Sequence, residues 1–262
     1  MGKTVVAFDL DDTLTASKSS LAPDMATLLC RLLAGHRVCV ISGAAFAQFQ
    51  TQLLDGLDAP PALLDRLHLM PTCGTAYYVH AGDRSWRQVY NEELGDTDKR
   101  RISDVLTTGA RHLGLWEPNP SGVIIEDRGS QVTFSALGQR AGLEAKRKWD
   151  PDGSKREALR AYAAARLTGL EVRSGGTTSI DVTRAGIDKA YGMSKLIEHL
   201  SLSKHDILFF GDRLDEGGND YPVKAMGIDT VAVVGWQDTA QVIRALLEAD
   251  QPSTPASSAP PA

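Results

Sequence analysis

An apolar segment that runs straight into three acidic residues is the feature that most constrains the fold of this chain. Residues 5–8, Val-Val-Ala-Phe, are short, apolar and rich in β-branched side chains, which predicts a buried strand. Asp9, Asp11 and Asp12 follow at once. Ligands of open α/β sheets gather at the carboxyl ends of the strands. The segment therefore predicts a parallel sheet with a polar site at this strand end.

The crowding of these carboxylates has two interpretations. Like charges so close together repel one another unless a cation or a proton relieves them. A hard divalent ion such as Mg²⁺ takes oxygen ligands, usually one or two carboxylates with waters and a substrate phosphate. The alternative is an acidic turn in which one aspartate only caps the next helix.

Three further segments supply groups that match a phosphate site. A second apolar strand, residues 206–212, ends in an acid and is followed by the acidic, glycine-rich loop 213–220. A third strand ends in Ser42 and Gly43, a hydroxyl and a backbone that can approach a phosphate closely. Lys189 stands just before a helical pattern. Together these groups favour the metal interpretation.

At these positions the sequence resembles the haloacid dehalogenase superfamily of phosphotransferases. Residues 9–13 resemble its DxDxT nucleophile motif, and Ser42 resembles its second motif. Lys189 matches the third motif, and residues 211–212 with 219–220 match the fourth. The resemblance implies a doubly wound α/β core that carries a cap domain.

Within the superfamily, the chain is most similar to the eukaryotic-type phosphomannomutase family, whose cap is of the C2B type. The segments that carry this similarity are residues 125–140, 175–182 and 209–221. Three departures stand beside it. Asp12 replaces the usual glycine, residues 71–74 replace an acid-asparagine-glycine loop, and residues 214–216 add negative charge.

Composition excludes several other classes of protein. The chain has 262 residues, enough for one large or two modest domains, and a formal net charge of −5. That charge leaves no basic footprint for nucleic acid. Cys30, Cys39 and Cys73 form an odd set without CxxC spacing, so neither a disulfide framework nor a zinc site is expected. No apolar run predicts a signal peptide or a membrane span, and we expect a cytoplasmic protein without a membrane partner.

The order of elements predicts an inserted domain. Strands and helices alternate at both ends of the chain, whereas short strands separated by turns, with two helical stretches, fill the middle. We therefore expect an α/β core from residues 1–82 and 187–250, an α+β cap from 83–186, and a disordered Pro/Ser/Ala-rich tail at 251–262.

The two aspartates of the first motif are the candidates for the chemistry. Phosphoryl transfer needs an in-line nucleophile, neutralisation of charge and a proton shuttle. Asp9 is predicted to be the nucleophile and to form an aspartyl-phosphate. Asp11 is predicted to give Mg²⁺ its backbone carbonyl and to use its side chain as general acid and base.

The other motifs supply the remaining groups of the core site. Asp212 is predicted to be the third metal ligand, while Asn219 and Asp220 hold the waters of the metal or orient Lys189. Ser42 donates to a phosphoryl oxygen, and Lys189 offsets charge between the phosphate and the nucleophile. The alternative for Lys189 is an ordinary solvated lysine at a helix start.

Substrate selection is assigned to the cap. Arg128, Arg140 and Arg147 are expected on or after adjacent strands, where a planar guanidinium suits a phosphate. The alternative is that they are surface arginines. In the mutase family, arginines at such positions grip the phosphate remote from the metal. Arg128 matches directly, whereas Arg140 and Arg147 match only if one residue is inserted near Gln139.

Without that insertion Gln139 and Lys146 take the places of the two arginines. Ser179 and Asp181 match without adjustment, the first near the distal phosphate and the second toward the sugar hydroxyls.

The resemblance implies Mg²⁺-dependent phosphoryl transfer on a hexose phosphate, with mannose 6-phosphate and mannose 1-phosphate as the expected pair. The second hypothesis is a sugar-phosphate phosphatase that uses the same core and passes the phosphoryl group to water. The third is a catalytically silent sugar-phosphate-binding protein, which the intact set Asp9, Asp11 and Asp212 argues against. A homodimer formed through the cap is left open.

Overall fold

The computed structural model describes residues 3–83 and 85–249, and the predicted tail at 251–262 lies outside them. In this part of the chain a seven-stranded sheet forms the core, in the order β11-β10-β1-β2-β3-β4-β5. The pairs from β11 to β3 are parallel, and β4 and β5 are added antiparallel at one edge. The strands are β1 (Val5–Phe8), β2 (Arg37–Ile41), β3 (Leu67–Met70), β4 (Ala76–His80), β5 (Trp86–Asn91), β10 (Ile207–Gly211) and β11 (Asp229–Ala232).

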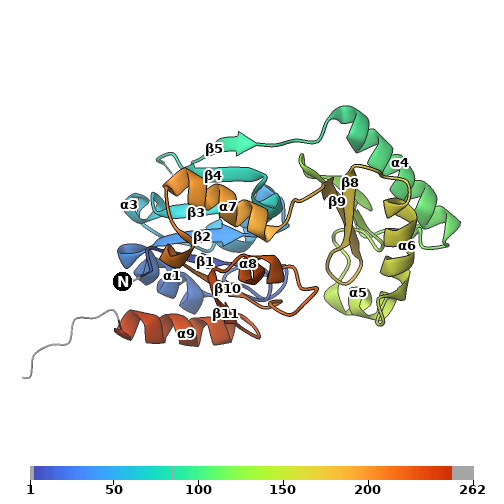
Figure 1. Ribbon diagram of the computed structural model, residues 1–262. Coiled ribbons are helices and arrows are strands. Elements are labelled where there is room, and N and C mark those ends of the chain that lie inside the picture. The colour runs from blue at the N-terminus through green and yellow to red at the C-terminus, as the bar shows by residue number, and fades with distance from the viewer. Residues whose placement is uncertain (1–2, 84, 250–262) are drawn as a thin grey trace, which may run out of the picture.

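Helices cover both faces of the core sheet (Figure 1). Val6 and Phe8 of β1 pack into one apolar cluster with α1, α2, η1, α3 and α9, while Val5 and Ala7 pack into another with α7 and α8. This alternation along one strand confirms the predicted doubly wound α/β core. The helices and turns are α1 (Pro23–Gly35), α2 (Phe46–Phe49), the π-helical η1 (Gln50–Leu54), α3 (Pro61–Leu64), η2 (Thr72–Gly74), α7 (Lys189–Leu200), η3 (Lys204–Asp206), α8 (Tyr221–Ala225) and α9 (Trp236–Ala249).

The cap is a four-stranded antiparallel sheet, ordered β6-β7-β9-β8, with helices on one face. In Figure 1, β8 and β9 lie between the core and helices α4 and α6. The helices pack on the apolar side chains of the sheet, among them Phe134 and Ile180. The elements are α4 (Asp96–His112), β6 (Ile125–Asp127), β7 (Gln131–Ser135), α5 (Leu143–Trp149), α6 (Ser154–Ala164), β8 (Leu170–Ser174) and β9 (Ser179–Arg184).

The structure moves the start of the cap toward the C-terminus. Strand β5, which the sequence interpretation placed in the cap from residue 83, pairs with β4 in the core sheet. A hairpin looks alike in sequence whichever sheet it joins, so its short strands did not show to which domain they belong. The chain therefore crosses to the cap after Asn91 and returns after Arg184 (Figure 1).

None of the helices in residues 3–83 and 85–249 is both long enough and apolar enough to cross a membrane.

Candidate active site

Two buried carboxylates and a buried lysine form the floor of the candidate site. Asp9 follows β1 and is 3% exposed, and its Oδ1 accepts a hydrogen bond from the backbone N–H of Leu10 at 2.7 Å. The Nζ atom of Lys189, the first residue of α7, lies 2.7 Å from Oδ1 of Asp9 and 2.6 Å from Oδ1 of Asp220. Asp188 caps this helix by accepting from the N–H of Tyr191. The cap fixes the first turn of α7 and so aims Lys189 at the nucleophile position.

A third carboxylate completes a candidate metal centre. One oxygen each of Asp9, Asp212 and Asp220 lies within 4.8 Å of the other two. Strands β1 and β10 are parallel neighbours, so the acids that follow them emerge at the same edge of the sheet. Hard oxygen donors of this kind suit Mg²⁺. The chemistry of the donor set therefore fits the predicted ion.

The two predicted residues of the loop before α8 differ in their surroundings. Asp220 is buried, and both its oxygens accept hydrogen bonds, Oδ1 from Lys189 and Oδ2 from the N–H of Arg213. Asn219 is exposed on the same loop. This geometry fits Asp220 as the residue that orients Lys189, which is one of the two roles predicted for it.

The pKa values of this cluster show how far the charge of Lys189 offsets the charges of the buried carboxylates. Burial raises the pKa of Asp9 to about 8, against the opposing charge of Lys189. Burial raises the pKa of Asp212 to about 6, with the charge of Asp220 adding to the effect. Burial would lower the pKa of Lys189, but the charges of Asp9 and Asp220 raise it above its ordinary value. The crowded carboxylates thus remain short of positive charge, as a cation site requires.

Ser42 lies on the same edge of the sheet, directly after β2. Its side chain is buried, and its Oγ accepts from the N–H of Ala44 at 3.2 Å, which leaves the hydroxyl proton to donate. The neighbouring carbonyl of Gly43 accepts from Nη1 of Arg128 in the cap at 2.9 Å. A second bond between cap and core joins the hydroxyls of Ser130 and Thr75. Ser42 of the core and Arg128 of the cap, both predicted to bind phosphate, therefore lie close to each other.

Asp11 stands apart from the carboxylate cluster. Its Oδ1 accepts from the backbone N–H of Lys18 at 2.7 Å and from Nε2 of Gln52 at 3.0 Å. This geometry fits the prediction that the side chain of Asp11 does not serve as a metal ligand. Gln52 was not predicted. It carries no motif and lies 41 residues away in sequence, so only a buried polar residue within an amphipathic stretch could have hinted at it.

The cap presents a polar sheet face opposite the one that its helices cover. Thr133 and Ser135 of β7 lie opposite Asp181 and Ser179 of β9. These polar pairs alternate along the strands with apolar pairs, so they point to the other face of the sheet. The hydroxyl of Thr133 donates to Oδ1 of Asp181 at 2.7 Å. Burial raises the pKa of Asp181, and the charge of Arg128 opposes the shift. The predicted residues Arg128, Ser179 and Asp181 thus share one face.

Cys73 connects this face electrostatically with the catalytic floor. Burial raises the pKa of its thiol to about 12, and the charges that modify the shift come from both domains. Lys189 and Asp9 act from the core, and Asp181 and Arg173 act from the cap. The polar face of the cap is therefore turned toward the carboxylate cluster.

The prediction for Arg140 and Arg147 is wrong in its geometry. Arg147 lies on helix α5 rather than on or after a strand, and both side chains are exposed. Within the described residues, no hydrogen bond or ion pair joins either side chain to Arg128 or Asp181. Helix α5 turns Lys146, the residue before Arg147, inward instead, because one step along a helix rotates the side chain by about 100°.

Gln139 and Lys146 occupy the inward positions. Lys146 is 6% exposed, and its Nζ donates to the carbonyl of Gln139 at 3.0 Å. Nε2 of Gln139 is buried without a hydrogen-bond partner among the residues described. Burial lowers the pKa of Lys146 to about 8, and the nearby cation of Lys18 in the core adds to this effect. This geometry favours the alternative without the insertion, in which Gln139 and Lys146 take the places of the two arginines.

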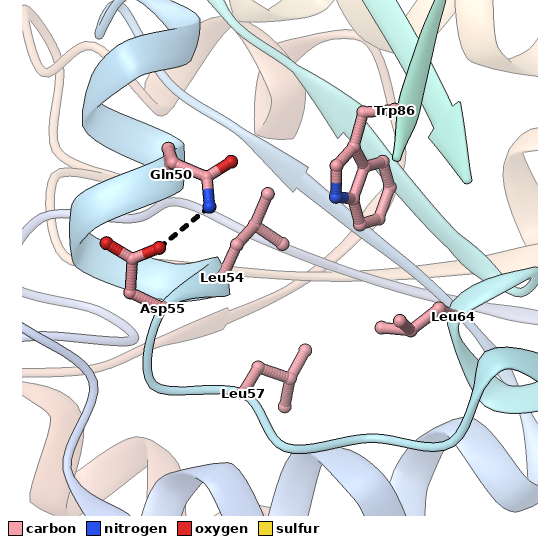
Figure 2. A pocket seen from close by; sticks show the side chains of 6 residues that line it. All are labelled: Gln50, Leu54, Asp55, Leu57, Leu64 and Trp86. Atoms are coloured by element: carbon pink, nitrogen blue, oxygen red, sulfur yellow. Dashed lines mark hydrogen bonds between the residues drawn. The ribbon is translucent and has the colours of Figure 1, made fainter. Parts of the chain in front are cut away.

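A hollow of about 440 Å³ lies elsewhere on the core, lined by residues of η1, α3, β5 and the loop between the two helices (Figure 2). Gln50 and Asp55 are hydrogen-bonded at 2.7 Å on its wall, with Leu64 and Trp86 among the apolar lining. No predicted site residue lines this hollow.

A sheet that ends in a nucleophile-type aspartate, a lysine bridge and a carboxylate cluster beneath an α+β cap defines a capped phosphotransferase of the haloacid dehalogenase type. Solved structures share this fold. A haloacid dehalogenase-like hydrolase from Bacteroides thetaiotaomicron superposes with a TM-score of 0.61 at 16% identity, covering 93% of this chain and 99% of that one. An IMP-bound IMP-nucleotidase from Plasmodium falciparum gives 0.67 at 14% identity, covering 94% and 68%.

Sequence comparison specifies the family. The profile of the eukaryotic phosphomannomutase family matches residues 25–249, and the chain belongs to this family. Human phosphomannomutase 1 is 28% identical over 250 residues, which cover 92% of this chain and 91% of the relative. The phosphomannomutase of Schizosaccharomyces pombe is 27% identical over 233 residues, covering 84% and 85%. The predicted family and enzyme class are confirmed.

Proposed function

We propose that the protein is a Mg²⁺-dependent phosphomannomutase that interconverts mannose 6-phosphate and mannose 1-phosphate through an aspartyl-phosphate. The observation that carries the proposal is the bridge of Lys189 between Asp9 and Asp220 beside Asp212. Membership of the phosphomannomutase family supports the choice of hexose phosphate.

Asp9, Asp212 and the backbone carbonyl of Asp11 would hold the ion, with Asn219 near its waters. When bound, Mg²⁺ neutralises charge on the transferring phosphoryl group and on the carboxylates around it. Lys189 supplies further positive charge on the side of Asp9. The chain thus offsets the repulsion that a dianionic phosphate meets at an acidic site.

In the first half-reaction a carboxylate oxygen of Asp9 attacks phosphorus. The new O–P bond forms in line as the bond between phosphorus and the sugar oxygen breaks. The hydroxyl of Ser42 donates a hydrogen bond to a phosphoryl oxygen. Asp11 gives its proton to the departing sugar oxygen. In the second half-reaction Asp11 removes a proton from the attacking hydroxyl, and the phosphoryl group passes from Asp9 to that oxygen.

A mutase must also hold the intermediate that carries two phosphates. Arg128, Lys146 and Gln139 offer positive charge and hydrogen-bond donors on the cap, and Nε2 of Gln139 has no partner among the described residues. Ser179 adds a hydroxyl toward the distal phosphate, and Asp181 can accept from sugar hydroxyls. The intermediate can then reverse its orientation without losing the phosphoryl group to water.

The phosphatase hypothesis is kept because of the groups that this part of the cap turns inward. Lys146 and Gln139 are an ammonium and an amide, and neither has the planar fork with which a guanidinium binds a phosphate in a bidentate way. A looser distal grip favours escape of the intermediate, and hydrolysis of the aspartyl-phosphate then competes with transfer.

Product analysis tests the proposal and separates the two outcomes. The protein is incubated with mannose 6-phosphate, Mg²⁺ and a catalytic amount of hexose bisphosphate, and the products are separated by chromatography. Mannose 1-phosphate supports the mutase, whereas mannose with free phosphate shows a phosphatase. Chelation of Mg²⁺ abolishes either activity, and turnover that survives chelation would exclude the proposed mechanism. The homodimer through the cap stays a prediction, which light scattering checks.

A further inference from the structure

The side chain of Asp11 is held through one of its two oxygens. Both hydrogen bonds that it accepts, from the N–H of Lys18 and from Nε2 of Gln52, end on Oδ1. Within the described residues no hydrogen bond reaches Oδ2. A carboxylate held in this way has a fixed direction and keeps one oxygen for another partner.

We propose that Gln52 is a positioning residue for proton transfer: its side-chain amide fixes Oδ1 of Asp11 and leaves Oδ2 to exchange the proton with the substrate oxygen. The proposal rests on the phosphoryl transfer proposed above. An amide suits this task because it donates a hydrogen bond firmly and does not itself titrate, so it does not compete for the proton.

The surroundings of Gln52 hold the amide in this orientation. The side chain is 4% exposed, and its Oε1 accepts from Nε2 of Gln48 at 3.4 Å, which leaves Nε2 to face Asp11. The backbone carbonyl of Gln52 accepts from the N–H of Leu21 at 2.7 Å, so the residue also anchors the end of the loop that begins at Asp11. Gln52 belongs to the π-helical turn η1, a geometry that is frequent at functional sites.

The segment that contains this turn also carries Ser42, the predicted donor to the phosphoryl group. The segment after β2 begins with Ser42, passes through α2 and reaches Gln52 in η1. One segment therefore places a hydrogen-bond donor for the phosphoryl group and a donor for the proton-transfer residue. The remaining donor to Asp11, the N–H of Lys18, comes from an exposed loop residue with a left-handed φ of 55°. Gln52 is thus the more firmly anchored of the two.

The test uses a series of aryl phosphates with leaving groups from nitrophenol to phenol. Release of the phenol in a single turnover reports formation of the phosphoenzyme. Gln52→Met keeps the size of the side chain and removes the donor. We expect the rate with phenyl phosphate to fall about 10- to 100-fold, because a poor leaving group needs a well-placed proton. With nitrophenyl phosphate, which leaves without assistance, we expect less than about a threefold loss.

Gln50→Met is the matched control. Gln50 lies in the same turn, but its side chain bonds to Asp55 at the hollow of Figure 2. Its rates should stay within about twofold of the wild type for every leaving group.

A double variant decides whether Gln52 acts through Asp11. In an Asp11→Asn background, Gln52→Met should cause no further loss with phenyl phosphate, the substrate on which Gln52→Met alone has its large effect, because the proton carrier is already absent. A further loss in that background, or an equal loss across the whole leaving-group series, would overturn the proposal. These substrates engage only the core, so the result stands even if mannose phosphates prove not to be substrates. Failure of the phosphoryl-transfer mechanism would instead appear as turnover by Asp9→Asn.

Discussion

The catalytic floor and the cap face neutralise their charges in different ways. On the floor, Lys189 is fully buried between the carboxylates of Asp9 and Asp220. On the cap, Lys146 donates to a backbone carbonyl, and the charge that acts on it is that of Lys18, a second cation. The floor therefore has much of its charge compensation within the chain, whereas this part of the cap has positive charge that an anionic ligand would balance. The difference supports the proposal that the chemistry takes place on the floor and that the cap selects the substrate.

The largest effect should come from the floor. Asp9→Asn removes the nucleophile, because an amide does not attack phosphorus, and turnover should fall by at least about 10³-fold on every substrate. Steady-state assays with nitrophenyl phosphate and with mannose 6-phosphate measure this loss. Circular dichroism serves as the control for folding. Substantial Mg²⁺-dependent turnover by a folded variant would remove Asp9 from its role.

Asp11→Asn tests the second aspartate of the first motif, which lies beside the floor. The backbone carbonyl stays in place while proton transfer is lost, so turnover of a sugar phosphate should fall about 10²- to 10⁴-fold. With nitrophenyl phosphate the burst of nitrophenol should be much less affected, because nitrophenolate leaves without a proton. Equal losses for both substrates would count against Asp11 as general acid.

Arg128→Ala tests whether the cap binds the phosphate of a hexose phosphate. A charge-assisted hydrogen bond to phosphate contributes roughly 1.5–3 kcal/mol, so kcat/KM for a hexose phosphate should fall by about one to two powers of ten. A small aryl phosphate reaches only the floor and should be turned over almost as before. If both substrates lose the same factor, Arg128 supports the joining of cap and core rather than selection.

Lys146 and its neighbour Arg147 offer a matched pair with a smaller effect. Lys146→Met should lower the affinity for a hexose phosphate about fivefold, since a single ammonium contact contributes about 1 kcal/mol, while Arg147→Met should leave it unchanged. The pKa of Lys146 is lowered to about 8, so the side chain is cationic below pH 8 and neutral above. Wild-type affinity should weaken as pH rises through 8.

In Lys146→Met this dependence should be lost, as calorimetric titration across pH 7–9 would show. A stronger effect of Arg147→Met than of Lys146→Met would reverse the assignment of the two residues.

The floor was predictable from sequence because each of its groups follows its own strand or begins its own helix. Parallel strands end at one edge of a sheet, so Asp9, Ser42 and Asp212 had to meet there once the strands were recognised. Lys189 needed only a helix start beside that edge. Local pattern and sheet geometry together were sufficient for these residues.

The cap was harder because a shift of one residue changes which side chain faces inward. Arg140 and Gln139 are neighbours, as are Arg147 and Lys146, and only the backbone of the turn and of α5 decides between them. Gln52 was missed for another reason. Its contact with Asp11 is formed by tertiary packing across 41 residues, and no spacing in the sequence records it.

The hydrogen bonds of Arg128 to Gly43 and of Ser130 to Thr75 have a kinetic consequence. They join the cap to the core beside the candidate site, so they contribute to holding the two domains together. If a substrate enters only when both bonds are broken, its observed affinity is reduced by the fraction of molecules in which they are broken. Association should therefore be slower than diffusional encounter and should reach a plateau at high substrate concentration, at the rate at which the domains separate.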